Sequence, residues 1–124
     1  MAFPGDITIN DGAVSTVMSE IYRQANETLR RDAARGLVFP KTMRIAHQQV
    51  NAAIGGKANR ALIRLDDVQN TDATDPTKKS GDAVYFVIQH PENIASKTAI
   101  LNMVKEMKAF LTPENVAKLL NGES

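Results

Sequence analysis

Residues 59–68 read NRALIRLDDV, and residues 82–91 read DAVYFVIQHP. Both stretches are rich in strand-forming residues, and their side chains alternate between two faces, as in the strands of an antiparallel sheet. In the first stretch, Arg60 and Arg64 lie on the face opposite Ile63. The two stretches therefore predict a sheet with one apolar face and one cationic face, with an exposed polar loop between the strands.

Two short helices are predicted after the second strand. Apolar residues recur at helical spacing from about Ser96 onward, and Thr112-Pro113 supplies a capping hydroxyl followed by a residue that is well tolerated at the first helical position. Gly122 can end the second helix. One small sheet cannot cover the apolar stripes of both helices. We therefore expect an α+β chain whose helices need an additional surface on which to bury their apolar sides.

The segments upstream complete the predicted sheet. Asp11-Gly12 indicates a two-residue hairpin turn between two short strands. Further along, Ile45 lies on the side opposite Arg44 in a second alternating segment. We expect that segment and residues 59–68 to form an antiparallel hairpin with a long connection.

Residues 15–35 allow two interpretations. Val17, Ile21 and Leu29 belong to a four-residue apolar spacing that favours an amphipathic helix ending at Gly36. A set of shorter strands is the alternative, and only tertiary contacts could select it over the local preference for helix. The choice stays open at this point.

Composition limits the classes of function. The 124 residues correspond most simply to a single domain over 1–124, and a formal net charge of +1 means that any nucleic-acid contact depends on charges arranged on one face. With no cysteine, the chain has neither disulfides nor thiolate metal sites. His47 and His90 have no catalytic or metal-binding motif beside them, and the aspartates around residues 66–82 do not match an EF-hand. We expect a soluble cytosolic protein with no enzyme activity, cofactor, metal or membrane segment.

The order of these elements resembles the coat proteins of single-stranded RNA bacteriophages, the levivirus type. The resemblance rests on ITINDG (7–12), KTMRIAHQ (41–48), NRALIRLDDV (59–68) and VYFVIQHP (84–91), together with the polar loop and the two helices. It implies an antiparallel meander sheet with an N-terminal hairpin within residues 1–91 and two helices within 94–122. In this family the sheet extends across an intertwined homodimer, and the helices pack on the partner subunit.

The same resemblance implies a structural capsid subunit. Its dimers would assemble into an icosahedral virion shell in the cytoplasm of the bacterial host and package the single-stranded RNA genome. Binding of an RNA hairpin would also make the protein a translational repressor. The polar loop between the two long strands would make contacts around the symmetry axes of the shell.

Transferred to this sequence, the resemblance places an RNA-binding set on the polar face of the sheet. Its members are Thr42, Arg44, Gln48, Arg60, Arg64, Tyr85 and Gln89. The arginines can contact phosphates in a salt-sensitive way, and Tyr85 can stack on an unpaired base, a contact worth roughly 1–3 kcal/mol. The alternative is an ordinary solvated face, with Arg44 and Arg64 paired to carboxylates such as Asp66 and with Tyr85 packed at the dimer seam.

Two other classes of protein remain open. A small helical DNA-binding regulator would use residues 15–35 as one helix, which would carry Arg23, Arg30, Arg31 and Arg35. A small dimeric binding protein without nucleic acid would use a pocket lined by Tyr85 and Val87.

Overall fold

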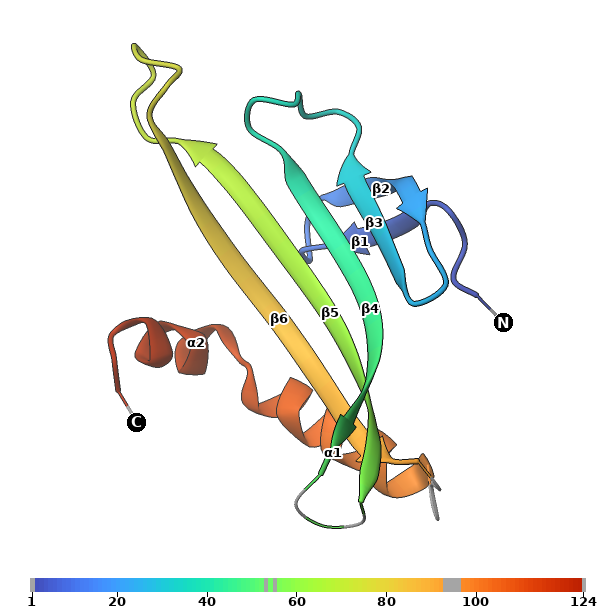
Figure 1. The fold of residues 1–124 in the computed structure, drawn as a ribbon. Coiled ribbons are helices and arrows are strands. Elements are labelled where there is room, and N and C mark those ends of the chain that lie inside the picture. Colours follow the sequence, from blue (N-terminus) through green and yellow to red (C-terminus); the bar gives the residue numbers. More distant parts are fainter. Residues whose placement is uncertain (1, 53, 55, 93–96, 124) are drawn as a thin grey trace.

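Over the residues that this computed structural model describes, 2–52, 54, 56–92 and 97–123, the chain forms one six-stranded antiparallel sheet followed by two helices (Figure 1). The strands pair in sequence order, and their bounds are β1 (Ile7–Asn10), β2 (Ser15–Arg23), β3 (Glu27–Asp32), β4 (Lys41–Asn51), β5 (Lys57–Asn70) and β6 (Lys79–Pro91). The helices are α1 (Lys97–Phe110) and α2 (Pro113–Leu120). The predicted α+β meander with an N-terminal hairpin and two C-terminal helices is confirmed.

The faces predicted for the long strands are confirmed by the register of the sheet. Met43 of β4, Leu65 of β5 and Val84 of β6 are neighbours across the strands. The adjacent row contains Arg44 and Arg64. Because successive residues of a strand point to opposite faces, the apolar row and the arginine row lie on opposite sides of the sheet.

The ends of the long strands differ from the prediction. β5 and β6 stay paired for longer than expected, so the polar loop shrinks from the predicted 69–81 to 71–78. The connection from β4 to β5 is residues 52–56, which is shorter than the long connection expected, and Gly56 supplies a positive φ of 75° there. Backbone pairing extends into turn-forming sequence because each added ladder pair satisfies polar backbone groups.

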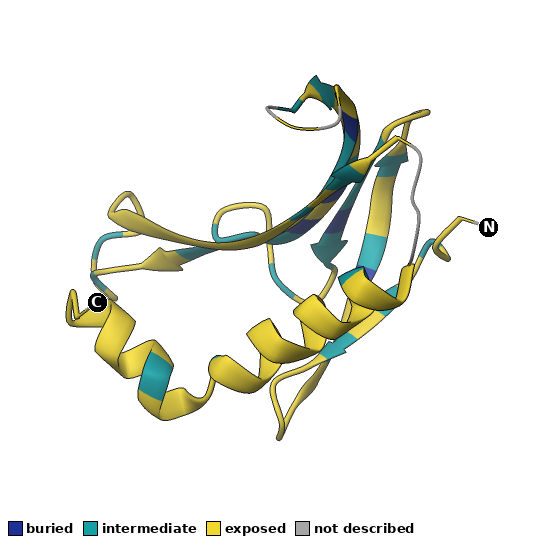
Figure 2. Ribbon diagram, turned by 90° about the horizontal axis from the view of Figure 1, so that it is seen from below, coloured by how far each residue is buried: buried dark blue, intermediate teal, exposed yellow. Residues whose placement is uncertain are grey.

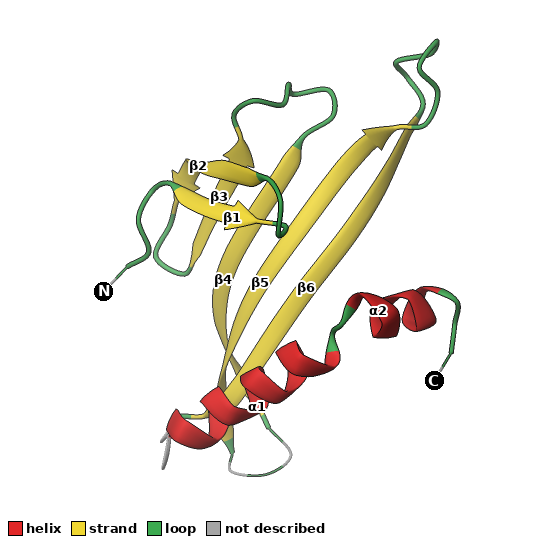
Figure 3. Cartoon of the chain, turned by 180° about the vertical axis from the view of Figure 1, so that it is seen from behind, coloured by secondary structure: helices red, strands yellow, loops and turns green. Residues whose placement is uncertain are grey.

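The β1–β2 hairpin folds over the apolar face of the sheet, on the same side as α1 (Figure 3). Its Met18 is fully buried against Met43 and Ile45, and Ile7 and Ile9 of β1 pack against this cluster. The hairpin therefore covers the apolar face around β4, and it lies with α1 on that side of the sheet. The cationic face is open.

The turn of this hairpin is longer than predicted. The ladder leaves residues 11–14 as a four-residue connection in place of the expected two-residue turn. The Asp11 carboxylate accepts hydrogen bonds from the backbone N–H groups of Ala13 and Val14 at 2.8 and 2.7 Å, and Gly12 has a φ of 102°. These bonds, from Val14 and then Ala13, lower the pKa of Asp11. The Asp11 side chain thus closes this four-residue turn, whereas backbone pairing alone would close a two-residue turn.

Residues 15–35 form β2, β3 and their connections, so the helical interpretation of this segment is wrong. The four-residue spacing does not mark one face, because Met18 is the buried side chain of β2 while Val17 and Ile21 are about half exposed. The register shifts at Ile21, which is a bulge that re-aims the strand. Tertiary pairing overrides the local helix preference here. In the described part of the chain, the arginine-bearing helix that a DNA-binding regulator would need does not exist.

Two arginines hold the N-terminal segment against the sheet. Arg30 of β3 is fully buried, and it donates from Nη2 to the Pro4 carbonyl at 2.7 Å and from Nε to the Gly5 carbonyl at 3.0 Å. Arg23 donates to the Phe3 carbonyl at 2.8 Å. A buried charge is costly without hydrogen-bond partners. These contacts therefore fix the chain where it enters β1.

The predicted start of the second helix is confirmed. Pro113 is its first residue, and the Thr112 hydroxyl accepts a hydrogen bond from the backbone N–H of Asn115 at 3.3 Å. The expected start of the first helix near Ser96 lies outside the described residues. Neither α1 nor α2 contains a buried residue among those described, and Figure 2 shows both helices mostly in the colour of exposed residues, with no segment in the colour of buried ones.

Candidate nucleic-acid interface

The open face of the sheet carries all seven residues predicted to bind RNA. The register of β4, β5 and β6 places them in three rows: Thr42 in the first, Arg44, Arg64 and Tyr85 in the second, and Gln48, Arg60 and Gln89 in the third. Cross-strand pairing thus brings together residues that are far apart in the sequence. Their role in binding RNA stays a prediction.

Carboxylates neutralise the second row. Arg44 Nε lies 2.7 Å from Oε1 of Glu27, and Arg64 Nε lies 2.9 Å from Oδ2 of Asp66. The hydrogen bond to Asp66 raises the pKa of Arg64. The Arg64 guanidinium also lies 5.6 Å from the ring centroid of Tyr85, within the range of a cation–π contact. This row matches the expected pairing of arginines with carboxylates.

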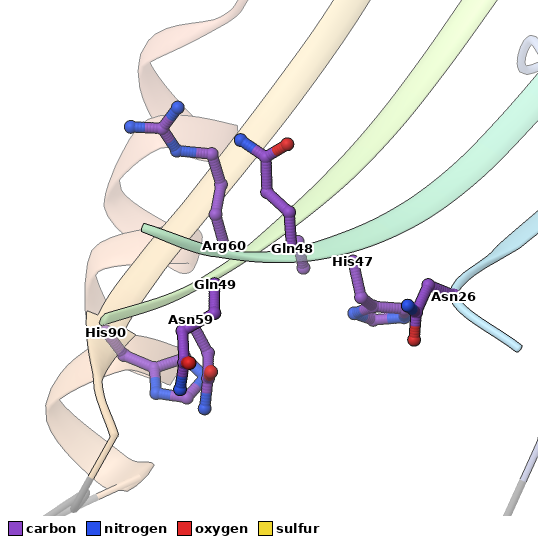
Figure 4. Close-up of a pocket in the computed structure, with 8 residues that line it drawn as sticks. Asn26, His47, Gln48, Gln49, Asn59, Arg60 and His90 are labelled. Carbon is purple, nitrogen blue, oxygen red and sulfur yellow. The ribbon is translucent and has the colours of Figure 1, made fainter. Parts of the chain in front are cut away.

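The third row keeps its positive charge. Arg60 donates from Nε and Nη2 to Oε1 of Gln89 at 3.3 and 2.8 Å, and no carboxylate of the described residues lies within ion-pair distance of it. Figure 4 shows Arg60 and Gln48 pointing to the same side of the strands, away from Asn59 and His90. A guanidinium that is paired only with a neutral amide retains its full charge for an anionic ligand. Arg60 is therefore the best placed of the predicted arginines to bind a phosphate.

A hollow of about 200 Å³ adjoins Arg60. Its apolar lining consists of Ala46, Leu62 and Val87, which form one row across the strands of the open face, and Gln48 also lines it. An apolar floor with polar groups at its edge suits a flat aromatic group such as a nucleobase.

A larger hollow of about 490 Å³ lies at the same end of these strands (Figure 4). It is rich in amide and imidazole groups, and its lining residues are Asn26, His47, Gln48, Gln49, Asn59, Arg60, Ala61 and His90. None of these carries a carboxylate. Across the part of the chain that the structure describes, no three His, Cys, Asp or Glu side chains are grouped so that they could hold a metal ion.

Two residues of this face were missed by sequence reasoning. Arg31 of β3 pairs in register with Thr42, and its Nε is buried without a hydrogen-bond partner among the described residues. Glu27 is the carboxylate that neutralises Arg44. Both lie in residues 15–35, where the helical interpretation concealed them. The alternation of the segment from Glu27 to Arg31 is the signal that a strand interpretation would have used.

The aspartates of the 71–78 loop close local turns. Asp72 Oδ1 accepts hydrogen bonds from the backbone N–H and the hydroxyl of Thr74 at 3.0 and 2.7 Å. Asp75 Oδ1 accepts the same pair of bonds from Thr77 at 2.9 and 2.6 Å. These bonds lower the pKa of both carboxyl groups. The loop therefore shapes itself through its own side chains.

The whole arrangement of sheet and helices matches solved structures of phage particles. The virus-like particle of bacteriophage AVE019 aligns with a TM-score of 0.75 at 12% identity, over 95% of this chain and 94% of that chain. The bacteriophage EMS014 coat protein aligns with a TM-score of 0.68 at 14% identity, over 89% and 74%. The virus-like particle of Wenzhou levi-like virus 1 aligns with a TM-score of 0.66 at 13% identity, over 99% and 100%. The chain has the fold of levi-like bacteriophage coat proteins.

This coat-protein fold is present without a detectable match in sequence. No protein-family model and no curated protein matches the chain. At identities this low, the likeness establishes the fold alone, and at that level the resemblance inferred from the order of strands and helices is confirmed. In the described ranges, neither helix is long and apolar enough to cross a membrane.

Proposed function

We propose that this chain is the structural capsid subunit of a single-stranded RNA bacteriophage, and that its homodimers assemble into an icosahedral shell around RNA. The observation that carries the proposal is the free edge of β6. Within the described chain this strand pairs only with β5, and its Val84, Phe86 and Val87 are 64, 40 and 49% exposed. A long apolar edge of this kind invites pairing with a second sheet. The likeness in fold to virus-like particles supports a shell over a dimer that stays in solution.

The exposed area of the chain also supports a partner. Its accessible surface is 9348 Å². A compact monomer of 13.5 kDa has about 6,500 Å², so roughly 2,800 Å² is in excess. That excess is comparable with the surface that each chain buries in a large obligate dimer.

The helices supply the second part of the proposed dimer interface. α1 and β6 enclose a hollow of about 230 Å³, lined from the helix side by Met103 and Met107 among others. On α2, Leu119 and Leu120 are 51 and 83% exposed. Figures 1 and 3 show α2 extending past the β6 edge, on the side away from β5. We expect both helices to lie across the strands of the partner in an intertwined homodimer, whose monomer then has no stability of its own to measure.

RNA would bind on the open face, with Arg60 as the principal phosphate contact. Its charge is not neutralised by a carboxylate among the described residues, and the amides of Gln48 and Gln89 lie in the same row. Arg44 and Arg64 would have to exchange a carboxylate for a phosphate, so each contributes less to the affinity. This distribution of charge explains how a chain with a net charge of only +1 can attract a polyanion.

An unpaired base has two candidate positions on this face. The hollow floored by Ala46, Leu62 and Val87 adjoins the charged third row. Tyr85 is 60% exposed, and its ring offers a stacking surface beside Arg64. RNA loops and bulges expose such bases, which is where sequence preference in RNA usually operates. Binding of one RNA hairpin there would make the coat protein a translational repressor as well.

The rival classes have less support. The DNA-binding regulator needed a helix where β2 and β3 lie, so it is not proposed. For a small-molecule binding protein, Val87 lines a hollow, but Tyr85 stands largely exposed beneath Arg64. The similar structures are particles and a coat protein, which supports a structural role over an enzymatic one.

Expression in a bacterial host tests the proposal directly. We expect electron microscopy of the cell lysate to reveal uniform shells that formed in the host cytoplasm, and nuclease treatment followed by extraction to recover protected RNA. Empty shells would support the capsid function but contradict RNA packaging. A protein that stays a monomer or dimer at every concentration and salt would contradict the capsid function itself.

A further inference from the structure

The loop between β3 and β4 is anchored at its start. The Asp32 carboxylate accepts a hydrogen bond from the backbone N–H of Ala34 at 3.0 Å, which closes the first turn. Arg35 then reaches β5, with Nη1 2.5 Å from Oδ1 of Asp67 and Nη2 2.8 Å from the Val68 carbonyl. The first half of the loop is therefore held against the neighbouring hairpin.

The far end of the same loop is also fixed. Val68 donates its backbone N–H to the Pro40 carbonyl at 3.0 Å, and the Lys79 ammonium lies 5.7 Å from the ring centroid of Phe39. Val68 and Lys79 both belong to the β5–β6 hairpin. The loop is thus docked onto this hairpin from both sides.

Between these anchors, the loop directs two apolar side chains outward. Leu37 is 76% exposed and Val38 is 50% exposed, so the folded chain buries neither side chain fully. Single exposed apolar residues are common on protein surfaces. An adjacent pair on a loop that is already held in place is different, because it loses little conformational entropy when it meets another surface.

The position of the loop suits contact between dimers. A two-fold dimer interface is closed, so a shell needs a second kind of contact that joins one dimer to the next. Under the proposed function, the β6 edge and the helices meet the partner and the open face meets RNA. The ends of the sheet are left for that second contact. Figures 1 and 3 place the β3–β4 and β5–β6 loops at the same end of the sheet.

We propose that Leu37 and Val38 form an apolar contact with a second copy of this chain that belongs to a neighbouring dimer. The inference rests on the proposed capsid function and adds the residues that join the dimers. The β5–β6 loop at this end is polar, with the Lys78 ammonium 3.5 Å from Oδ2 of Asp72. An apolar centre with a charged border is the usual composition of a protein–protein interface.

The test compares the double variant Leu37→Asp/Val38→Asp with the control Val14→Asp. Val14 is 62% exposed on the β1–β2 turn, so it matches the other two in exposure and type. We expect the double variant to remain a dimer with the circular dichroism spectrum and melting temperature of the parent. The protein concentration needed for shells should rise about tenfold or more. Val14→Asp should assemble as the parent does.

Each outcome of this comparison either supports or contradicts the proposed contact between dimers. Assembly of the double variant at the parent's concentration would overturn the inference, and so would loss of its dimer, because the loop would then belong to the dimer or to the folded chain. A second variant, Leu37→Ala/Val38→Ala, adds no charge and should shift assembly in the same direction by a smaller factor. If only the aspartates have an effect, charge repulsion is the cause and the inference is wrong. A parent that forms dimers but no shells contradicts the proposed function instead.

Discussion

The first five strands and the last third of the chain differ in how much of their surface the chain itself covers. The buried side chains of the described residues are Met18, Arg30, Met43, Ile45 and Ala58, and all of them lie in β2–β5. In their described residues, β6, α1 and α2 bury none. The contrast separates a part that builds its own small core from a part whose apolar residues stay exposed, and it is this second part that we propose to be buried against a second chain.

A charge on the apolar side of α1 is the strongest test of this contrast. Met107→Asp would place a carboxylate in the proposed dimer interface, so we expect dimerisation to weaken about a thousandfold, or about 4 kcal/mol. Ala109→Asp, on the polar side of the same helix, should leave the dimer intact. Sedimentation velocity over a concentration series measures both. Equal effects of the two substitutions would mean that this helix face is not an interface.

The N-terminal core can be weakened without touching the dimer edge. Met18→Ala removes a fully buried side chain, and we expect it to lower the free energy of unfolding by about 2–5 kcal/mol. Val17→Ala, the neighbour on the opposite face, should cost less than about 1 kcal/mol. Urea unfolding at a fixed protein concentration compares them. The contrast between the two regions would fail if Met18→Ala lowered the free energy of unfolding no more than Val17→Ala does.

On the open face, the row of Gln48, Arg60 and Gln89 keeps its positive charge, whereas Arg44 and Arg64 of the second row are paired with carboxylates. The two rows can therefore be compared. Arg60→Gln should lower the affinity of the dimer for single-stranded RNA about tenfold and reduce the salt slope by about 0.7 to 1. Arg44→Gln and Arg64→Gln should change the slope less, because their charges are already paired. Fluorescence anisotropy with a labelled RNA at several salt concentrations gives the slopes. Equal slopes for the three variants would mean that ion pairing does not decide which arginine binds phosphate.

The smallest expected effect concerns the ion pair between Arg35 and Asp67. Burial raises the pKa of Asp67, but the hydrogen bonds from Arg35 and Gln69 outweigh burial, so the net pKa lies below the usual 3.8. A depressed pKa means that the pair stabilises the folded chain above pH 3.8 and that this contribution is lost as the pH falls through the lower folded-state value.

We therefore expect Asp67→Asn to cost no more than about 1 kcal/mol at neutral pH, since the carboxylate is partly exposed. The difference from the parent should vanish in strong acid. Urea unfolding of both proteins at neutral pH and at about pH 2 measures it. A difference that persists at the lower pH would show that the charge of Asp67 is not what stabilises the loop.

Much of the C-terminal half was predictable because its signals are local. The strict alternation of β5 and β6 assigns Arg60 and Tyr85 to one face whatever the register, and Thr112-Pro113 marks a helix start through its own chemistry. The same alternation put the seven predicted RNA-binding residues on one face.

The N-terminal half was less predictable because its secondary structure depends on contacts between residues that are far apart in the sequence. Nothing local in residues 15–35 shows that Met18 would be buried by β4 or that Arg30 would find its partners in the Pro4 and Gly5 carbonyls. The charge state of the site was hidden for the same reason, since Glu27 neutralises Arg44 only once β3 lies beside β4. The buried contacts and the charge of the site both depend on cross-strand pairing, which cannot be read from the order of the residues alone.

The two outer strands of the sheet are unequal in length. β6 has 13 residues, whereas β1 has four. Hydrogen bonds from Arg23 and Arg30 hold the segment that precedes β1 against the sheet. So short a border offers few backbone groups to an incoming strand. In the proposed dimer, two copies join at β6 and the combined sheet ends at β1 on both sides, so a third copy finds no long edge to extend. The short β1 border would therefore keep the proposed dimer from growing into a fibre of paired strands.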